Sequence, residues 1–93
     1  MIIALDYDNT FDRDPDSWYE AMLRMKMGGH TIIGATMRYP SEASGMSKRY
    51  EALCTKIYFT SRQAKKFFLA EHGQRVDVWI DDTPEWILGD ALA

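Results

Sequence analysis

The sequence predicts an α/β fold, a three-layer sandwich built on a short parallel sheet of about four strands. Four short apolar segments alternate along the chain with segments that carry helix start and stop signals. Strands that alternate with helices in this way are joined by right-handed crossovers and form a parallel sheet. The chain has 93 residues and shows no linker, internal repeat or low-complexity tract, so residues 1–93 are expected to form a single domain.

The N-terminal part of the chain carries the first strand and the first helix. Residues 2–5 read IIAL, a continuous apolar run that is typical of a buried parallel strand, and the run stops at Asp6. A helix is predicted over 15–27, because Asp14-Pro15 is a typical helix start and Gly28-Gly29 ends the apolar spacing. The apolar side chains of this helix form a wide sector that could cover a sheet: Trp18, Tyr19, Met22, Leu23, Met25 and Met27.

The middle of the chain carries two further strands and a weaker helix. Residues 31–36 form an apolar run that ends at the hydroxyl of Thr36. A helix is predicted over 41–54, although Gly45 interrupts it. Residues 57–59 are expected to form the third strand.

The last part of the chain repeats the alternation. A helix is predicted over 62–72, with Ser61 as its N-cap. The fourth strand is predicted over 76–80, and a short helix starts within 83–85.

Polar side chains stand at the ends of three of these strands: Asp6 and Asp8, then Thr36, then Asp81 and Asp82. Because sites in parallel sheets form beyond the carboxyl ends of the strands, we expect these side chains to converge. Crowded carboxylates repel one another unless a cation joins them, and ligation by oxygen alone favours Mg²⁺ over Zn²⁺. The sequence therefore predicts a magnesium site made by Asp6, Asp8, Asp81 and Asp82.

The order of these residues resembles the four motifs of the haloacid dehalogenase superfamily, whose fold is Rossmann-like. The resemblance spans about residues 1–85 and rests on DYDNT at residues 6–10, on Thr36, on a lysine at the start of helix 62–72, and on Asp81-Asp82. The D-x-D motif alone is a weak signal, because glycosyltransferases use it too. All four motifs in this order are more specific.

The resemblance implies a role for each motif residue. Asp6 would be the nucleophile that forms an aspartyl-phosphate, and Asp8 would be the general acid/base. Dehalogenases of the family lack the second Asp and the ATPases carry Thr there, so Asp8 favours a phosphatase. Thr36 could equally be a structural hydroxyl at a strand end. The residues expected to bind substrate are Thr36, Met37, Arg38 and Lys65, with Asp81 and Asp82 anchoring Mg²⁺.

Two adjacent lysines, Lys65 and Lys66, compete for the third motif, and their spacing alone does not decide between them. On a helix they point about 100° apart, so only one can face the strand ends. If Ala64, Phe67 and Phe68 form the buried face, Lys65 lies beside Phe68 and nearer the helix start. We therefore expect Lys65 to bind the phosphoryl group.

The chain departs from the family pattern in two ways. Asn9 and Phe11 stand where Gly and Leu are usual, and Asn tolerates unusual backbone angles. No loop is long enough for a cap domain and a fifth strand is missing, which resembles the cap-less branch of the family. Cap-less members act on phosphates of macromolecules or borrow closure from another subunit. The expected partner is a phosphorylated small molecule, nucleotide or nucleic-acid end, and the helix 15–27 sector is the candidate surface for a homo-oligomer.

Composition excludes several other classes of protein. Hydrophobic residues make up 46% and charged residues 27%, which is globular rather than disordered composition. No apolar run approaches the roughly 18 residues of a membrane span, and the single Cys54 cannot form an internal disulfide, so a cytoplasmic protein without membrane contact is expected. The net charge of −3 argues against strong nonspecific nucleic-acid binding, although ten of the eleven Lys/Arg lie in residues 24–75 and could face an anion.

Two alternatives to an enzyme remain open. A phosphate- or Mg²⁺-binding module without turnover, such as an oligomer subunit, would have the same fold, although the intact Asp6, Asp8 and Lys65 favour the enzyme. A signalling phosphoacceptor of receiver type also uses acidic residues, Thr and Lys. Its phosphoacceptor Asp would follow the third strand, where this chain has Thr60.

Overall fold

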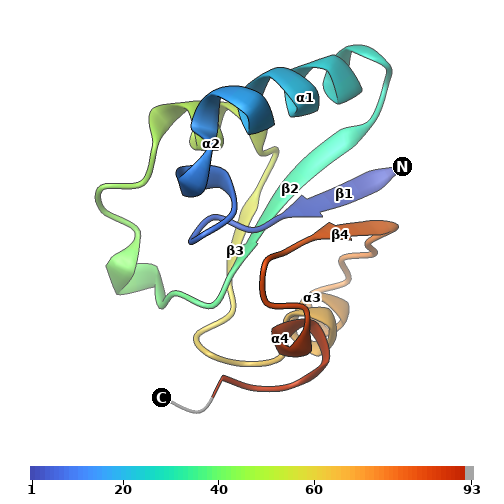
Figure 1. Cartoon of the computed structure of the whole chain (residues 1–93). Helices are drawn as coiled ribbons and strands as arrows, with labels where there is room; N and C mark the ends of the chain where they lie inside the picture. Colours follow the sequence, from blue (N-terminus) through green and yellow to red (C-terminus); the bar gives the residue numbers. More distant parts are fainter. Residues whose placement is uncertain (92–93) are drawn as a thin grey trace.

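A four-stranded, all-parallel sheet forms the centre of the protein, as the computed structural model of residues 1–91 shows (Figure 1). The strand order is β3-β2-β1-β4, and the strands are β1 (Ile2–Leu5), β2 (Thr31–Thr36), β3 (Ile57–Phe59) and β4 (Val78–Ile80). The helices are α1 (Pro15–Met27), α2 (Lys48–Leu53), α3 (Lys65–Glu71) and α4 (Glu85–Leu88), with two 3-10 helices, η1 (Phe11–Arg13) and η2 (Pro40–Glu42). The predicted α/β sandwich is confirmed, and none of the loops among the described residues holds a cap domain.

Two layers of helices cover the two faces of the sheet. Helices α1 and α2 lie on one face and α3 and α4 on the other (Figure 1). The core beneath α1 and α2 is the larger, and it includes Leu5, Phe11, Met22, Ile32, Tyr50 and Leu53. The core on the α3 side is smaller, and it consists of Ala4, Ile33, Ala35, Tyr58 and Leu69. Side chains of β1 and β2 therefore alternate between two buried faces, which explains why these strands are continuous apolar runs.

Tyr50 of α2 ties the larger core to the middle of the sheet. Its ring is fully buried, and its hydroxyl donates a hydrogen bond of 2.6 Å to the carbonyl oxygen of Leu5. This close approach requires glycine on the neighbouring strand, because a Cβ on Gly34 would lie 2.5 Å from the Tyr50 hydroxyl oxygen. Gly34 is thus explained by packing.

The strand order reverses at β1, and this places the candidate site. Strands β2 and β3 follow on one side of β1, whereas β4 pairs with its other side. Ligands of open α/β sheets bind beyond the carboxyl ends of the strands at such a switch point. The residues that directly follow β1 and β4 are Asp6 and Asp81.

The helix predicted over 41–54 is wrong in its first half. Only η2 and the shorter α2 form there, because Gly45 takes a left-handed backbone with φ 84° that ends any helix. Ser47 then starts α2 as its N-cap, and its side chain accepts a hydrogen bond of 3.2 Å from the Arg49 N–H.

The helix predicted over 62–72 also starts later than expected, at Lys65. Ser61 is not its N-cap, because Ser61 and Arg62 have left-handed φ values of 54° and 69°, whereas an N-cap is typically extended. The N-cap position is held by Ala64, whose N–H donates a 2.7 Å hydrogen bond to the Asp90 carboxylate. The carboxylate of Asp90, which is distant in the sequence, thus accepts a hydrogen bond at the start of α3.

Three smaller predictions need correction. Strand β4 begins at Val78 rather than at residue 76. Phe67 is exposed, whereas Ala64 is buried and Phe68 packs against the smaller core as predicted, and Lys65 and Leu69 complete the buried side of α3. The apolar sector of α1 is narrower than predicted, since Met27 is 82% exposed. Among the described residues, no helix is long and apolar enough to cross a membrane.

Candidate functional site

Three carboxylates meet where β1 and β4 end. Asp6, Asp81 and Asp82 each offer one carboxylate oxygen, and these oxygens lie within 4.8 Å of one another. The two strand ends are held together by a 2.9 Å hydrogen bond from the Asp6 N–H to the carbonyl oxygen of Ile80. The convergence follows from parallel pairing, since both strands run toward the same edge of the sheet. We call these three residues the carboxylate cluster.

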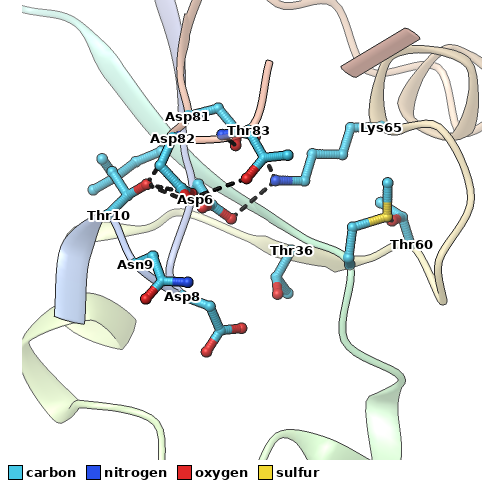
Figure 2. Close-up of polar contacts among 12 residues, drawn as sticks. Asp6, Asp8, Asn9, Thr10, Thr36, Thr60, Lys65, Asp81, Asp82 and Thr83 are labelled. Atoms are coloured by element: carbon cyan, nitrogen blue, oxygen red, sulfur yellow. Dashed lines mark hydrogen bonds and ion pairs between the residues drawn. The ribbon is translucent and has the colours of Figure 1, made fainter. Parts of the chain in front are cut away.

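The ammonium group of Lys65 reaches this cluster from the start of α3 (Figure 2). Its Nζ donates hydrogen bonds of 2.9 Å to Asp6 and 2.5 Å to Asp81. The side chain of Lys65 is only 1% exposed, and those of its two partners are 8% and 3% exposed. Lys66 is exposed on the outside of the helix. Lys65 is therefore the lysine that the fold brings to the strand ends.

Two threonines complete the hydrogen bonds of the cluster. The Thr10 hydroxyl is 3.0 Å from an Asp6 oxygen and 3.1 Å from an Asp82 oxygen, and it can donate to either. Thr83 donates its N–H to Asp81 at 2.9 Å and its hydroxyl to Asp82 at 3.1 Å. Neither threonine was predicted from the sequence to belong to the site. For Thr10 a signal was present, because it is the last residue of the DYDNT segment that contains Asp6.

The charges of the cluster are only partly balanced. Burial raises the pKa of Asp6 to about 7, against the lowering effect of the Lys65 ammonium group. Burial also tends to raise the pKa of Asp82, but the Asp6 carboxyl in its protonated form and hydrogen bonds from Thr83 and Thr10 outweigh it, so this pKa is lowered. The Asp6 and Asp81 side chains are buried and Asp82 is exposed, and one buried ammonium group leaves the three carboxylates with net negative charge, which a hard divalent cation or a proton would relieve.

Asp8 lies apart from the carboxylate cluster. Its two oxygens accept hydrogen bonds of 2.9 Å and 2.8 Å from Nε and Nη2 of Arg38, a bidentate ion pair. Figure 2 shows its carboxylate pointing away from the other three. The side chain predicted as a fourth metal ligand is thus held by a guanidinium group, and this pairing raises the pKa of Arg38.

The other predicted substrate residues lie at the end of β2. The Thr36 hydroxyl is buried and accepts a 3.2 Å hydrogen bond from the Arg38 N–H. Met37 is buried too, and its sulfur accepts a hydrogen bond from the Thr60 hydroxyl at 3.4 Å. Arg38 also donates from Nη1 to the Glu42 carbonyl at 2.8 Å. These contacts hold the segment after β2 against the side of the site.

A pocket of 140 Å³ opens on the carboxylate cluster. Its lining contains five residues named from the sequence, which are Asp6, Asp8, Met37, Lys65 and Asp82. It also contains four that sequence reasoning missed, which are Asn9, Arg62, Thr83 and Trp86. Among them, Asn9 has a left-handed backbone with φ 61°, a conformation that Asn tolerates better than most residues. A wider hollow of 720 Å³ on the other side of Asp82 is bounded by Trp18 and Trp79.

Comparisons of the chain with models of protein families, with curated proteins and with solved structures find no match.

Proposed function

We propose that this protein is a Mg²⁺-dependent phosphomonoester hydrolase of haloacid dehalogenase type, in which Asp6 is the nucleophile. The observation that carries the proposal is the buried ammonium group of Lys65, bound to Asp6 beside two further carboxylates at the switch point of a parallel sheet. A surface cluster of acidic residues would not need a buried lysine bound to two of its members. Such an arrangement fits a site that handles an anion at an anionic nucleophile.

The donor set fits magnesium. Asp6, Asp81 and Asp82 supply oxygen atoms only, and oxygen ligands suit a hard cation. Two of these carboxylates receive hydrogen bonds from Thr83, which orient them. A bound Mg²⁺ would supply charge neutralisation between the nucleophile and the phosphoryl oxygens. We count Asp8 as an acid/base rather than as a side-chain ligand, because Arg38 occupies its carboxylate.

The residues of the pocket can then divide the chemistry. An Asp6 oxygen attacks phosphorus, so an oxygen–phosphorus bond forms and the bond to the ester oxygen breaks. Asp8, which lines the same pocket, gives a proton to the leaving oxygen after it has separated from Arg38, whose guanidinium group otherwise engages both of its oxygens. It then takes a proton from the water that attacks the aspartyl-phosphate, which releases inorganic phosphate and restores Asp6. Lys65 stabilises the negative charge of the transferring group throughout.

The test is hydrolysis of an aryl phosphate by the wild type, Asp6→Asn and the control Asp16→Asn, with Mg²⁺ and with excess chelator. Asp16 is a suitable control, because its side chain is 92% exposed on α1. We expect activity that needs Mg²⁺, survives in Asp16→Asn and disappears in Asp6→Asn. Undiminished turnover in chelator or in Asp6→Asn would remove this mechanism.

A second candidate function is favoured by the Arg38–Asp8 ion pair. Because both oxygens of Asp8 are engaged, the same fold could bind phosphate and Mg²⁺ without turnover. Calorimetry would then detect Mg²⁺ and inorganic phosphate binding while the hydrolysis assay stays at background. The lifetime of any acyl-phosphate on Asp6 separates this module, and a signalling phosphoacceptor, from an enzyme that turns over.

A further inference from the structure

The pocket beside the carboxylate cluster is too small to enclose a whole organic substrate. Its volume is 140 Å³, whereas pockets that enclose drug-sized ligands measure about 300–1,000 Å³. Asp6 and Lys65, the groups proposed to act on phosphorus, belong to its lining. The part of a phosphomonoester beyond the phosphoryl group must therefore lie outside this pocket, next to the side chains at its opening.

Trp86 is the large apolar side chain at this place. It belongs to the first turn of α4, where its N–H donates a 3.0 Å hydrogen bond to the Thr83 carbonyl. Its side chain lines the pocket and the residue is 39% exposed. Trp18 and Trp79 pack against the two core clusters, but neither cluster, as far as the described residues go, includes Trp86. The indole thus lies outside both core clusters, and its exposed part borders the phosphoryl site.

A second aromatic ring is joined to the pocket by Arg62. The guanidinium group of Arg62 lies 5.3 Å from the ring centroid of Tyr39, which is 44% exposed. Arg62 is also fixed by a 2.8 Å hydrogen bond from Nη1 to the Met37 carbonyl and by an ion pair of 3.5 Å with Glu42. A fixed cation that lies over the Tyr39 ring and lines the same pocket as Trp86 is suited to a planar, polar and electron-rich group.

We propose that the substrate is a phosphomonoester that carries a nucleobase, and that Trp86 stacks on this base while Arg62 borders it. In such a compound a sugar separates the phosphate from the base, so the base lies outside the small pocket. In an aryl phosphate the ring is attached directly to the ester oxygen, and no spacer separates the two. Stacking on an aromatic side chain accepts any base, so the site selects the class of compound rather than one base. This inference rests on the proposed function, because it uses the same phosphoryl pocket.

The test compares a nucleoside 5′-monophosphate with ribose 5-phosphate, which has the same phosphoryl group and sugar but no base. Calorimetric binding and kcat/KM are measured with Mg²⁺ for the wild type, Trp86→Ala and the control Leu88→Ala. Leu88 is 62% exposed on the same helix and does not line the pocket. We expect the wild type to prefer the nucleotide by about 5- to 150-fold, the range of one base–aromatic stack. Trp86→Ala should lose this preference, and Leu88→Ala should retain it.

The outcomes separate this inference from the proposed function. Equal binding of the two compounds by the wild type, or an equal loss of both in Trp86→Ala, would overturn the role of the base. Binding of the nucleotide without hydrolysis would support base recognition and contradict the hydrolase. A phosphorylated oligonucleotide, measured at two salt concentrations, identifies the source of the base: salt-sensitive binding tighter than that of the mononucleotide indicates a nucleic-acid end, and equal binding indicates a free nucleotide.

Discussion

Replacing Lys65 by Met should destabilise the metal-free protein far more than it destabilises the magnesium form. Met keeps the unbranched stem and removes the ammonium group, so Asp6 and Asp81 lose hydrogen bonds of 2.9 Å and 2.5 Å in a buried place. Removing one partner of a buried ion pair costs about 3–5 kcal/mol, because the remaining charge is left uncompensated. A domain of this length has a free energy of unfolding of roughly 5–14 kcal/mol, so the loss is a large fraction of its stability.

The assay is urea denaturation followed by circular dichroism, in excess chelator and in excess Mg²⁺. It is run at about pH 8, above the pKa of about 7 that Asp6 has beside Lys65, so that the wild-type cluster is ionised. Loss of the ammonium group raises this pKa, so the cost of Lys65→Met includes protonation of Asp6 as well as unpaired charge. A bound cation replaces the charge of the lost ammonium group, so the cost of Lys65→Met should shrink in Mg²⁺. The matched control is Lys66→Met on the exposed side of α3, where we expect less than about 0.5 kcal/mol.

Two results would refute this reasoning. A free energy of unfolding that is the same for Lys65→Met and Lys66→Met in chelator would mean that the buried ion pairs do not contribute. An equal loss with and without Mg²⁺ would mean that a cation does not take over the role of the ammonium group at the carboxylate cluster. The same variants serve the hydrolysis assay, where Lys65→Met should lower the rate by about 10²–10³ and Lys66→Met should change it little.

Two further predictions concern the fold around the site. Asp90→Ala should lower the free energy of unfolding by about 1 kcal/mol, because the Ala64 N–H at the start of α3 loses its acceptor, and Asp90→Asn, which keeps an oxygen, should lose less. Equal stability of Asp90→Ala and the wild type in urea would show that the contact is dispensable. Gly34→Ala should cost about 1–3 kcal/mol, because the added Cβ would lie 2.5 Å from the Tyr50 hydroxyl oxygen. Gly28→Ala is its control, since a Cβ there meets nothing nearer than 3.4 Å, and equal thermal unfolding of the two variants would contradict the packing argument.

Much of the fold could be predicted because its signals are local. The apolar run of β1, the Pro15 start of α1 and the glycines after it depend only on neighbouring residues, and these elements have the predicted bounds. The meeting of Asp6 with Asp81 could be predicted as well, although 75 residues separate them, because parallel strands end at a common edge. The bounds of two helices were wrong: Gly45 ends the first half of the segment predicted over 41–54, and the start of α3 takes its hydrogen-bond partner from Asp90 rather than from Ser61.

The details of the candidate site depend on contacts between side chains from separate segments. No spacing in the chain indicates that Arg38 takes both oxygens of Asp8, or that Asp90 meets the start of α3. Trp86 could not be singled out either, because its place beside the pocket depends on how α4 packs against α3.

The sequence by itself therefore determined the sheet, the parallel direction of its strands and the edge where the carboxylates gather, since backbone pairing and apolar periodicity repeat along the chain. The sequence favoured Lys65 over Lys66, but only the tertiary structure decided the strand order, the burial of Lys65 against Asp6, and the pairing of Asp8 with Arg38 outside the carboxylate cluster. The physical reason is the sequence distance over which each kind of interaction acts. Hydrophobic patterning acts over a few residues, whereas a buried charge takes its partner from whichever segment the fold brings within hydrogen-bond distance.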